Sequence, residues 1–151
     1  MNKIKILLLA GVLLSSPLYA GDNYITKKSS NSVPVSMDRL ENALKQRGVG
    51  IVARVDHAGA AQKADLSLRP TQVLIFGNPK LGTPLMNNNQ QIGLDLPLKV
   101  LAWEDAKGQT WLTYEHTEMM AGRHGVKEPA EILKKMAGVL DAVTTEATTK
   151  K

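Results

Sequence analysis

The stretch LKVLAWEDAKGQTWLTYE, residues 98–115, decides the fold of this chain. Residues 98–104 and 109–115 predict two β-strands, and the residues between them run from Asp105 to Gly108. Aspartate at the first position and glycine at the last favour a type I turn. The stretch therefore predicts a β-hairpin.

Three more strands are expected before the hairpin. Residues 23–28 form a short candidate, and residues 49–57 follow a helix directly. Residues 72–76 are apolar on both faces, as in an interior strand. With the hairpin, this gives a sheet of about five strands.

Helical periodicity separates these strands. Val33, Met37, Leu40 and Leu44 recur at helical spacing after the cap residue Ser32. An alanine-rich helix is expected over residues 58–64, a third helix over 84–91 and a short helix over 117–124. A last helix is expected to begin near residue 129. Its apolar stripe consists of Ile132, Leu133, Met136, Val139, Leu140 and Val143.

Together these elements predict an α+β fold: a small mixed sheet with helices packed on one side. The expected order is strand, helix, strand, helix, strand, helix, strand, strand, helix, helix. Residues 21–31 would be an N-terminal strand and linker, residues 32–146 a single domain, and residues 147–151 a disordered tail.

Residues 1–20 have the pattern of a secretory signal peptide. Lys3 and Lys5 precede an apolar run over residues 6–14, and Ala20 is a small residue at the end. The run is too short for a membrane span, which needs about 20 residues. We therefore expect cleavage after Ala20 and a periplasmic or secreted protein with no membrane anchor.

Charge and composition limit the partners. The chain has 19 basic and 14 acidic side chains, and removing Lys3 and Lys5 lowers the excess to +3. Much of this excess lies at the two ends, and no basic stripe with interleaved aromatic residues is present, so nucleic-acid binding is not expected. The absence of cysteine excludes disulfides and thiolate metal sites.

Several motifs within residues 32–126 together resemble the domain-of-unknown-function 302 (DUF302) family. They are Asp56-His57 before the alanine-rich segment, Leu68-Arg69-Pro70-Thr71, Phe76-Gly77-Asn78-Pro79-Lys80, Gly82-Thr83-Pro84-Leu85-Met86, Leu96-Pro97-Leu98-Lys99-Val100, Trp103-Glu104-Asp105 and Arg123-His124. The resemblance implies a small α+β fold and a homodimer, which we expect to form through an exposed strand or the last helix. It supplies no reaction.

Gly77 and Gly82 have the glycine spacing of a phosphate-binding loop. That loop also needs a lysine and then a serine or threonine after its second glycine, where this chain has Thr83 and Pro84. Pro84 also lacks the backbone N–H that would face a phosphate. The residues therefore predict a turn before a helix that Thr83 caps.

Asp56 and His57 come at the end of the second strand. If that strand stays regular, His57 lies on the face of Val55, and Asp56 points to the other face or caps the alanine-rich helix. A histidine at this place can bind a ligand, carry a proton or be a satisfied interior group.

Metal binding depends on which histidines meet. His57, His116 and His124 contain no pair spaced by four residues. If the strands on either side of each helix run parallel, Asp56, His57, Asn78 and Trp103 lie at one edge of the sheet, and the hairpin sends His116 to the other. The short helix after His116 could then return His124 to His57.

Arg69 and the pair Arg123-His124 suggest an anion-binding pocket, because a guanidinium group binds a carboxylate at two points. Ordinary roles also fit: Arg69 can pack along its strand, and Arg123 can complement the end of a helix.

We therefore expect an exported domain that binds a small anionic or polar ligand at the strand ends. The candidate ligand-binding residues are Asp56, His57, Arg69, Asn78, Arg123 and His124. A copper- or zinc-handling protein is the second hypothesis, followed by an acid–base enzyme that uses Asp56 and His57. No serine, threonine or cysteine has the setting of a nucleophile, and no catalytic residue, metal ligand or cofactor is predicted.

Overall fold

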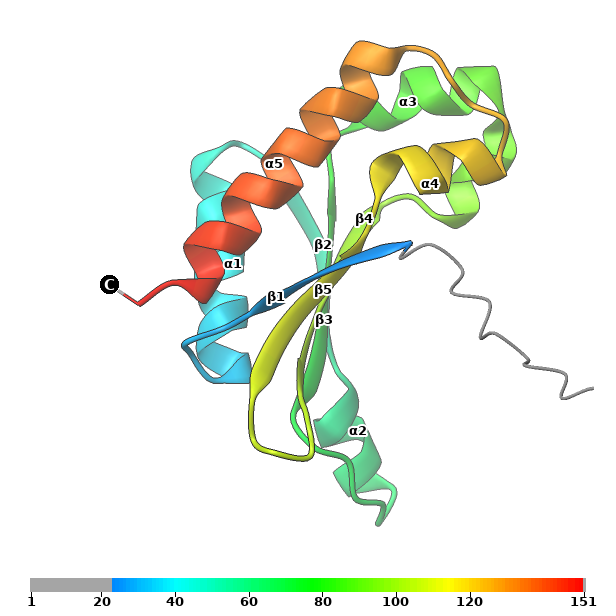
Figure 1. The fold of residues 1–151 in the computed structure, drawn as a ribbon. Helices are drawn as coiled ribbons and strands as arrows, with labels where there is room; N and C mark the ends of the chain where they lie inside the picture. The colour runs from blue at the N-terminus through cyan, green and yellow to red at the C-terminus, as the bar shows by residue number, and fades with distance from the viewer. Residues whose placement is uncertain (1–22, 151) are drawn as a thin grey trace, which may run out of the picture.

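The computed structural model describes residues 23–150, and the expected signal peptide lies outside the described residues. The elements follow the predicted order, with one additional 3₁₀ helix (Figure 1). They are β1 (Tyr24–Lys28), α1 (Val33–Gln46), β2 (Gly50–Asp56), α2 (His57–Lys63), β3 (Thr71–Gly77), α3 (Pro79–Asn88), η1 (Gln90–Leu94), β4 (Leu98–Glu104), β5 (Thr110–Glu115), α4 (Thr117–Arg123) and α5 (Ala130–Thr148).

The five strands form an open sheet in the order β1-β5-β4-β3-β2, which confirms the α+β class. Every neighbouring pair is antiparallel, so the sheet is not mixed. The reason is the position of the connections. A connection between parallel strands must cross a face of the sheet, whereas α2 and the α3–η1 segment lie beyond its two ends (Figure 1). The chain therefore returns to the sheet at the end where the previous strand stopped, and the next strand runs in the opposite direction.

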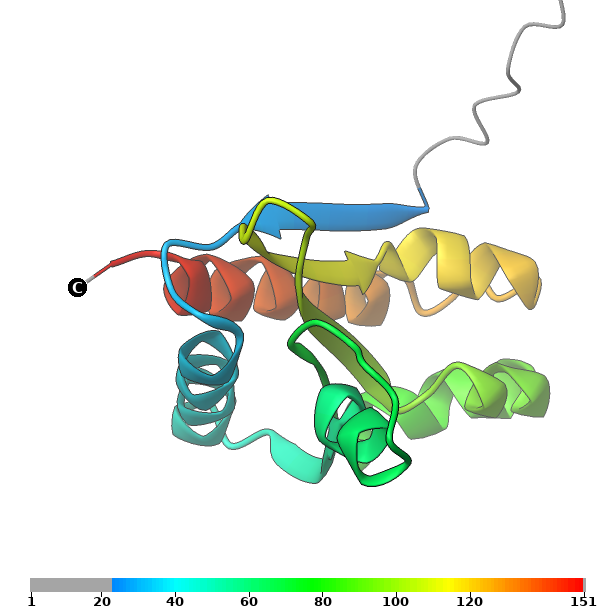
Figure 2. The ribbon, with the colours of Figure 1, turned by 90° about the horizontal axis from the view of Figure 1, so that it is seen from below.

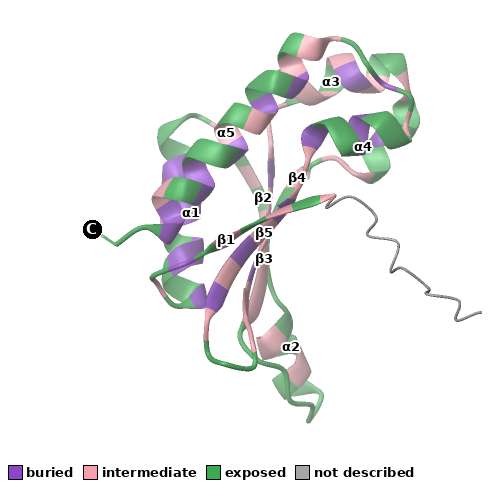
Figure 3. Ribbon diagram, in the orientation of Figure 1, coloured by how far each residue is buried: buried purple, intermediate pink, exposed green. Residues whose placement is uncertain are grey.

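The main hydrophobic core lies between one face of the sheet and helices α1 and α5 (Figures 1 and 3). The predicted stripe of α1 is buried throughout. It packs with Leu74, Phe76, Val100, Ala102, Leu112 and Tyr114 from the sheet and with Leu140, Val143 and Ala147 from α5. The helical spacing read from the sequence therefore identifies the core face of α1 correctly.

A second hydrophobic cluster lies beyond the end of the sheet. It joins α3, η1, α4 and the N-terminal half of α5 through Leu85, Ile92, Met120, Ala121, Val126, Leu133 and Met136. Leu98, at the start of β4, packs against both clusters. Helix α5 thus belongs to the core of the sheet at one end and to the second cluster at the other.

The hairpin between β4 and β5 is confirmed. The Asp105 carboxylate accepts hydrogen bonds from the backbone N–H groups of Lys107 at 2.8 Å and Gln109 at 3.0 Å, and from Nε1 of Trp111 at 2.9 Å. Gly108 has φ of +76°, a conformation that favours glycine. The hydrogen bond from Trp111 first, and then those from the Gln109 and Lys107 backbone, lower the pKa of Asp105.

The C-terminal segment is ordered further than expected. Helix α5 continues to Thr148, with Ala147 and Thr148 buried, so the prediction of disorder from residue 147 is wrong. Nδ2 of Asn31 donates to the carbonyl oxygen atoms of Ala147 at 3.0 Å and Thr149 at 3.2 Å. Packing against the segment that follows β1 therefore extends the helix.

The described helices leave the other face of the sheet open (Figures 1 and 2). It carries half-buried Val73, Ile75, Leu101, Trp103 and Trp111, with the two indole rings 6.4 Å apart. Because the apolar stripe of α5 is used within the chain's own core, α5 is a weaker candidate for a dimer contact than this face or the edge strands. The homodimer stays a prediction.

Two substitutions in α1 test the core assignment. Leu40 is fully buried, so Leu40→Ala should lower the free energy of unfolding by about 2–5 kcal/mol through lost burial and a cavity. Val35 on the same helix is 46% exposed, and Val35→Ala should change it by less than about 0.5 kcal/mol. Urea denaturation measures both, and equal effects would contradict the assignment.

Candidate functional site

The predicted site residues lie at two opposite ends of the sheet. Asp56 pairs with Gln72 at one end of β2 and β3, whereas Gly50 pairs with Gly77, the residue before Asn78, at the other. The antiparallel strands therefore separate Asp56 and His57 from Asn78. The expectation that these three residues share one sheet edge is wrong.

At the first end, the polar side chains have structural partners. Oδ1 of Asp56 accepts a hydrogen bond from the Gly59 backbone N–H at 2.9 Å, so Asp56 caps α2, one of its two expected roles. His57 is the first residue of α2 and is exposed, rather than ending a strand face. Nε of Arg69 donates to the Glu104 carbonyl oxygen at 3.1 Å.

Arg123 and His124 lie at the C-terminal end of α4 and bind carboxylates of the chain itself. Oδ2 of Asp95 accepts hydrogen bonds from Nε2 of His124 at 2.6 Å and from Nη2 of Arg123 at 3.0 Å. Glu115 holds Arg123 at two points. The guanidinium group is thus already engaged by two carboxylates, so an anionic ligand would have to displace one of them.

The Asp95 contacts join η1 to α4. Above all the hydrogen bond from His124, and then the contacts with Arg123, hold the pKa of Asp95 below its ordinary value. The sequence prediction named Arg123 and His124 but not Asp95 or Glu115. A carboxylate that follows a short 3₁₀ helix has no sequence pattern that shows which cation it meets.

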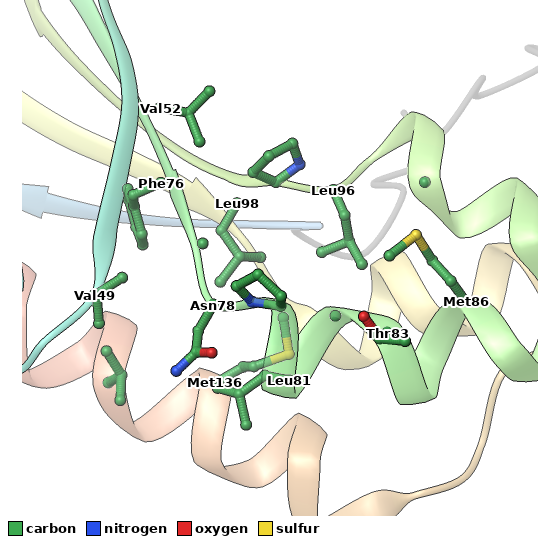
Figure 4. A pocket seen from close by; sticks show the side chains of 16 residues that line it. Val49, Val52, Phe76, Asn78, Leu81, Thr83, Met86, Leu96, Leu98 and Met136 are labelled. Atoms are coloured by element: carbon green, nitrogen blue, oxygen red, sulfur yellow. The ribbon is translucent and has the colours of Figure 1, made fainter.

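At the opposite end of the sheet, Asp56 and Arg69 line a larger and more polar pocket of about 680 Å³. A mainly apolar cavity lies where the sheet meets the second hydrophobic cluster. Its volume is about 390 Å³. Its walls come from the beginnings of β2 and β4, the end of β3, α3, η1 and α5 (Figure 4). The lining residues are Val49, Val52, Phe76, Gly77, Asn78, Pro79, Leu81, Gly82, Thr83, Met86, Gly93, Leu96, Pro97, Leu98, Met136 and Val139.

The lining has a simple chemical character. None of these residues has an ionisable side chain, and Asn78 and Thr83 supply the side-chain hydrogen-bonding groups. Asn78 is half-buried, whereas Thr83 is exposed. Met86 and Met136 are flexible and polarizable, so this wall can adapt to ligands of different shape.

Glycines keep part of this cavity open. A Cβ atom on Gly82 would lie 3.7 Å from Cδ1 of Leu96 and 3.8 Å from Cε of Met86, and one on Gly93 would lie 3.5 Å from Sδ of Met86. The glycine at position 82, which looked like part of a phosphate loop, therefore serves as a wall of an apolar cavity.

The start of α3 also differs from the sequence prediction. The helix begins at Pro79 rather than Pro84, and Oδ1 of Asn78 accepts a hydrogen bond from the Lys80 backbone N–H at 2.9 Å. Both Asn78-Pro79 and Thr83-Pro84 combine a capping residue with a proline. The first pair begins the helix because it follows the end of β3 directly, and Pro84 is accommodated inside the helix.

Comparison with known proteins gives the family. A family model described as "Domain of unknown function DUF302" matches residues 25–143. The chain belongs to the DUF302 family. A crystal structure of an uncharacterized conserved protein DUF302 from Bacillus stearothermophilus has the same fold, with a TM-score of 0.75 and 23% identity over 84% of this chain and 99% of that one.

Curated relatives of the DUF302 domain are longer proteins. The chain is 43% identical over 102 residues to fluoride-specific ion channel FluC 1 of Brucella suis biovar 1 and to FluC 2 of Brucella melitensis biotype 1. The match covers 68% of this chain but 40% and 38% of those proteins. The chain thus spans about two fifths of the length of these relatives.

Two further observations concern residues 23–150 alone. Within this part of the DUF302 domain, no group of three or more histidine, aspartate or glutamate side chains is arranged to hold a metal ion. None of its helices combines the length and apolar character needed to cross a membrane.

Asp95→Asn tests the junction between η1 and α4. A carboxylate with a lowered pKa stabilises the fold above its unfolded pKa of about 3.9, and that stability disappears as the pH falls through the folded pKa. Asp95→Asn should therefore lower the melting temperature at pH 7, and the difference from wild type should shrink as the pH approaches 2. Thermal unfolding followed by circular dichroism measures this, with exposed Asp65→Asn as the control. A difference that does not change with pH would contradict the assignment.

Proposed function

We propose that this DUF302 domain binds a small, mainly apolar molecule in the cavity between β3, α3 and α5. The observation that carries the proposal is a cavity of about 390 Å³ with an apolar lining and two polar side chains. Ligand sites in proteins have this character, with volumes of about 300–1,000 Å³ and few polar groups that fix orientation.

The proposal keeps the expected small-molecule ligand and changes its chemistry. Asp56, His57 and Arg69 lie at the opposite end of the sheet, and Arg123 is engaged by Asp95 and Glu115. Of the six predicted residues, Asn78 is the one that lines the cavity. An apolar ligand therefore fits this cavity better than an anionic one.

The cavity volume sets the size of the ligand. The volume of about 390 Å³ lies at the lower end of the range of about 300–1,000 Å³ that small-molecule sites occupy, so a compact ligand is expected. Burial of apolar ligand surface would supply the binding energy, at about 25 cal/mol per Å².

The names of the Brucella relatives suggest fluoride as a different ligand. Fluoride is a small anion that loses its hydration on binding, and this loss has to be offset by a cation or by several hydrogen-bond donors. The cavity lining has no cation. We therefore propose an organic ligand, and sodium fluoride serves as a negative control in the binding experiment.

Metal handling and acid–base catalysis have weaker support than ligand binding. His57 and His124 lie at opposite ends of the sheet, so the pair considered for copper or zinc does not meet. Asp56 caps α2, which occupies the carboxylate considered for acid–base chemistry.

We also propose export of the mature domain, on the basis of the basic, apolar and small-residue pattern of residues 1–20. When the full chain is expressed, the protein recovered from the periplasm or medium should lack residues 1–20. Cell fractionation with N-terminal sequencing measures this, and an uncleaved cytoplasmic protein would overturn the proposal.

Filling the cavity at Gly82 tests the binding proposal. Gly82→Leu places a side chain among Leu96 and Met86 and should weaken binding of the neutral fluorescent probe 1-N-phenylnaphthylamine by at least about 10-fold. Gly82→Ala adds one methyl group at van der Waals distance and should retain most binding. Both substitutions replace glycine within a helix, so both variants should stay folded.

Fluorescence titration measures these affinities, and thermal unfolding checks the fold. Sodium fluoride should not displace the probe. Equal probe affinity in wild type and in folded Gly82→Leu would overturn the proposal.

A further inference from the structure

We infer that the cavity selects an uncharged ligand with a hydrogen-bond acceptor, such as a ketone, ester or quinone oxygen, and that the Asn78 amide binds this oxygen. The inference rests on the proposed function and specifies its ligand class. It follows from three observations: the orientation of the Asn78 amide, the use of the backbone donors beside it and the absence of charge in the cavity lining.

The cap on α3 fixes which end of the Asn78 amide is free. The Lys80 backbone N–H donates to the amide oxygen at 2.9 Å, so the oxygen is assigned and the other atom is Nδ2. Asn78 is half-buried, and Figure 4 shows its side chain among apolar residues of the lining, near Leu81 and Met136. Nδ2 therefore offers N–H groups beside an apolar lining and stays accessible to water, and an acceptor on a ligand can replace that water.

The backbone at the start of α3 does not offer donors to an anion. Pro79 has no N–H, and the Lys80 N–H is bound by the Asn78 side chain. The N–H groups of Leu81 and Gly82 both donate to the Asn78 carbonyl oxygen, at 2.9 and 3.0 Å. The first turn of this helix is thus satisfied internally, unlike the helix ends that bind phosphate or carboxylate groups.

The lining also lacks a charge that could pair with an ionised ligand. A carboxylate or ammonium group in the cavity would lose water without gaining an ion pair, which is strongly unfavourable. A pure hydrocarbon would cover the Asn78 N–H groups without bonding them, which is also unfavourable. A neutral molecule with one acceptor avoids both costs.

The experiment compares three compounds with chains of nine carbon atoms as competitors of 1-N-phenylnaphthylamine at pH 7: nonan-2-one, nonane and nonanoate. Nonan-2-one should bind about 2- to 10-fold more tightly than nonane, the range for one net hydrogen bond. Nonanoate should bind at least about 10-fold more weakly than nonan-2-one.

Asn78→Asp is the decisive variant, because aspartate keeps an oxygen for the Lys80 cap and removes the N–H donors. It should lose the preference for nonan-2-one over nonane. Asn88→Asp adds the same charge to the same helix at an exposed residue outside the lining, and it should keep the preference. Asn78→Gly, which removes the side-chain donor and is tolerated at a helix N-cap, provides a second test if Asn78→Asp has a lowered melting temperature.

The outcomes separate this inference from the proposed function. If the probe binds but nonanoate competes as well as nonan-2-one, the neutral ligand class is overturned. If folded Asn78→Asp and Asn78→Gly both retain the ketone preference, the role of Asn78 is overturned. If wild type binds neither the probe nor any of the three compounds, the proposed function itself is overturned.

Discussion

Helix α5 packs against two separate hydrophobic clusters, and the arrangement of the rest of the chain depends on this double packing. Leu140, Val143 and Ala147 in its C-terminal half join the core over the sheet. Leu133 and Met136 in its N-terminal half join the cluster of α3, η1 and α4. A helix of 19 residues is about 28 Å long, enough to reach from the sheet to the helices beyond its end. The cavity lies between the two clusters, and Met136 and Val139 of α5 form one of its walls.

Polar contacts of Asp95 stabilise the second cluster in addition to its apolar packing. Asp95 follows η1, and it binds both Arg123 and His124 at the end of α4. Leu96 follows Asp95 directly and lines the cavity. The ion pair with Arg123 and the hydrogen bond with His124 therefore hold in place a segment that forms part of the cavity wall. These polar residues position the wall although they lie outside the lining.

The sequence predicts those parts of the fold that depend on local patterns. The stripe of Met37 and Leu40 indicates the core face of α1, and Asp105 with Gly108 indicates the hairpin. Strand direction was not predictable in this way, because it depends on whether a connecting helix crosses the sheet or stays beyond its end. The start of α3 was ambiguous, because Asn78-Pro79 and Thr83-Pro84 each place a proline directly after a capping residue.

The sequence predicted one residue of the candidate site, Asn78, but it did not predict that the site is apolar. Asn78 attracts attention as a polar residue after an apolar strand, and it does line the cavity. The apolar lining comes from β2, from the consecutive elements β3, α3, η1 and β4, and from α5. Nothing in Val52, Met86 or Met136 alone distinguishes a cavity wall from ordinary core. The charged residues that suggested an anion meet instead with partners such as Asp95, whose position depends on the tertiary fold.

The most direct test of small-molecule binding in this cavity is NMR spectroscopy of protein labelled at the methionine methyl groups. Met86 and Met136 line the cavity, whereas Met37 is buried in the core of the sheet and Met119 is exposed on α4. Titration with nonan-2-one should shift the signals of Met86 and Met136 and leave those of Met37 and Met119 nearly unchanged. Unchanged Met86 and Met136 signals at saturating ligand, or shifts confined to the other methionines, would contradict binding in this cavity.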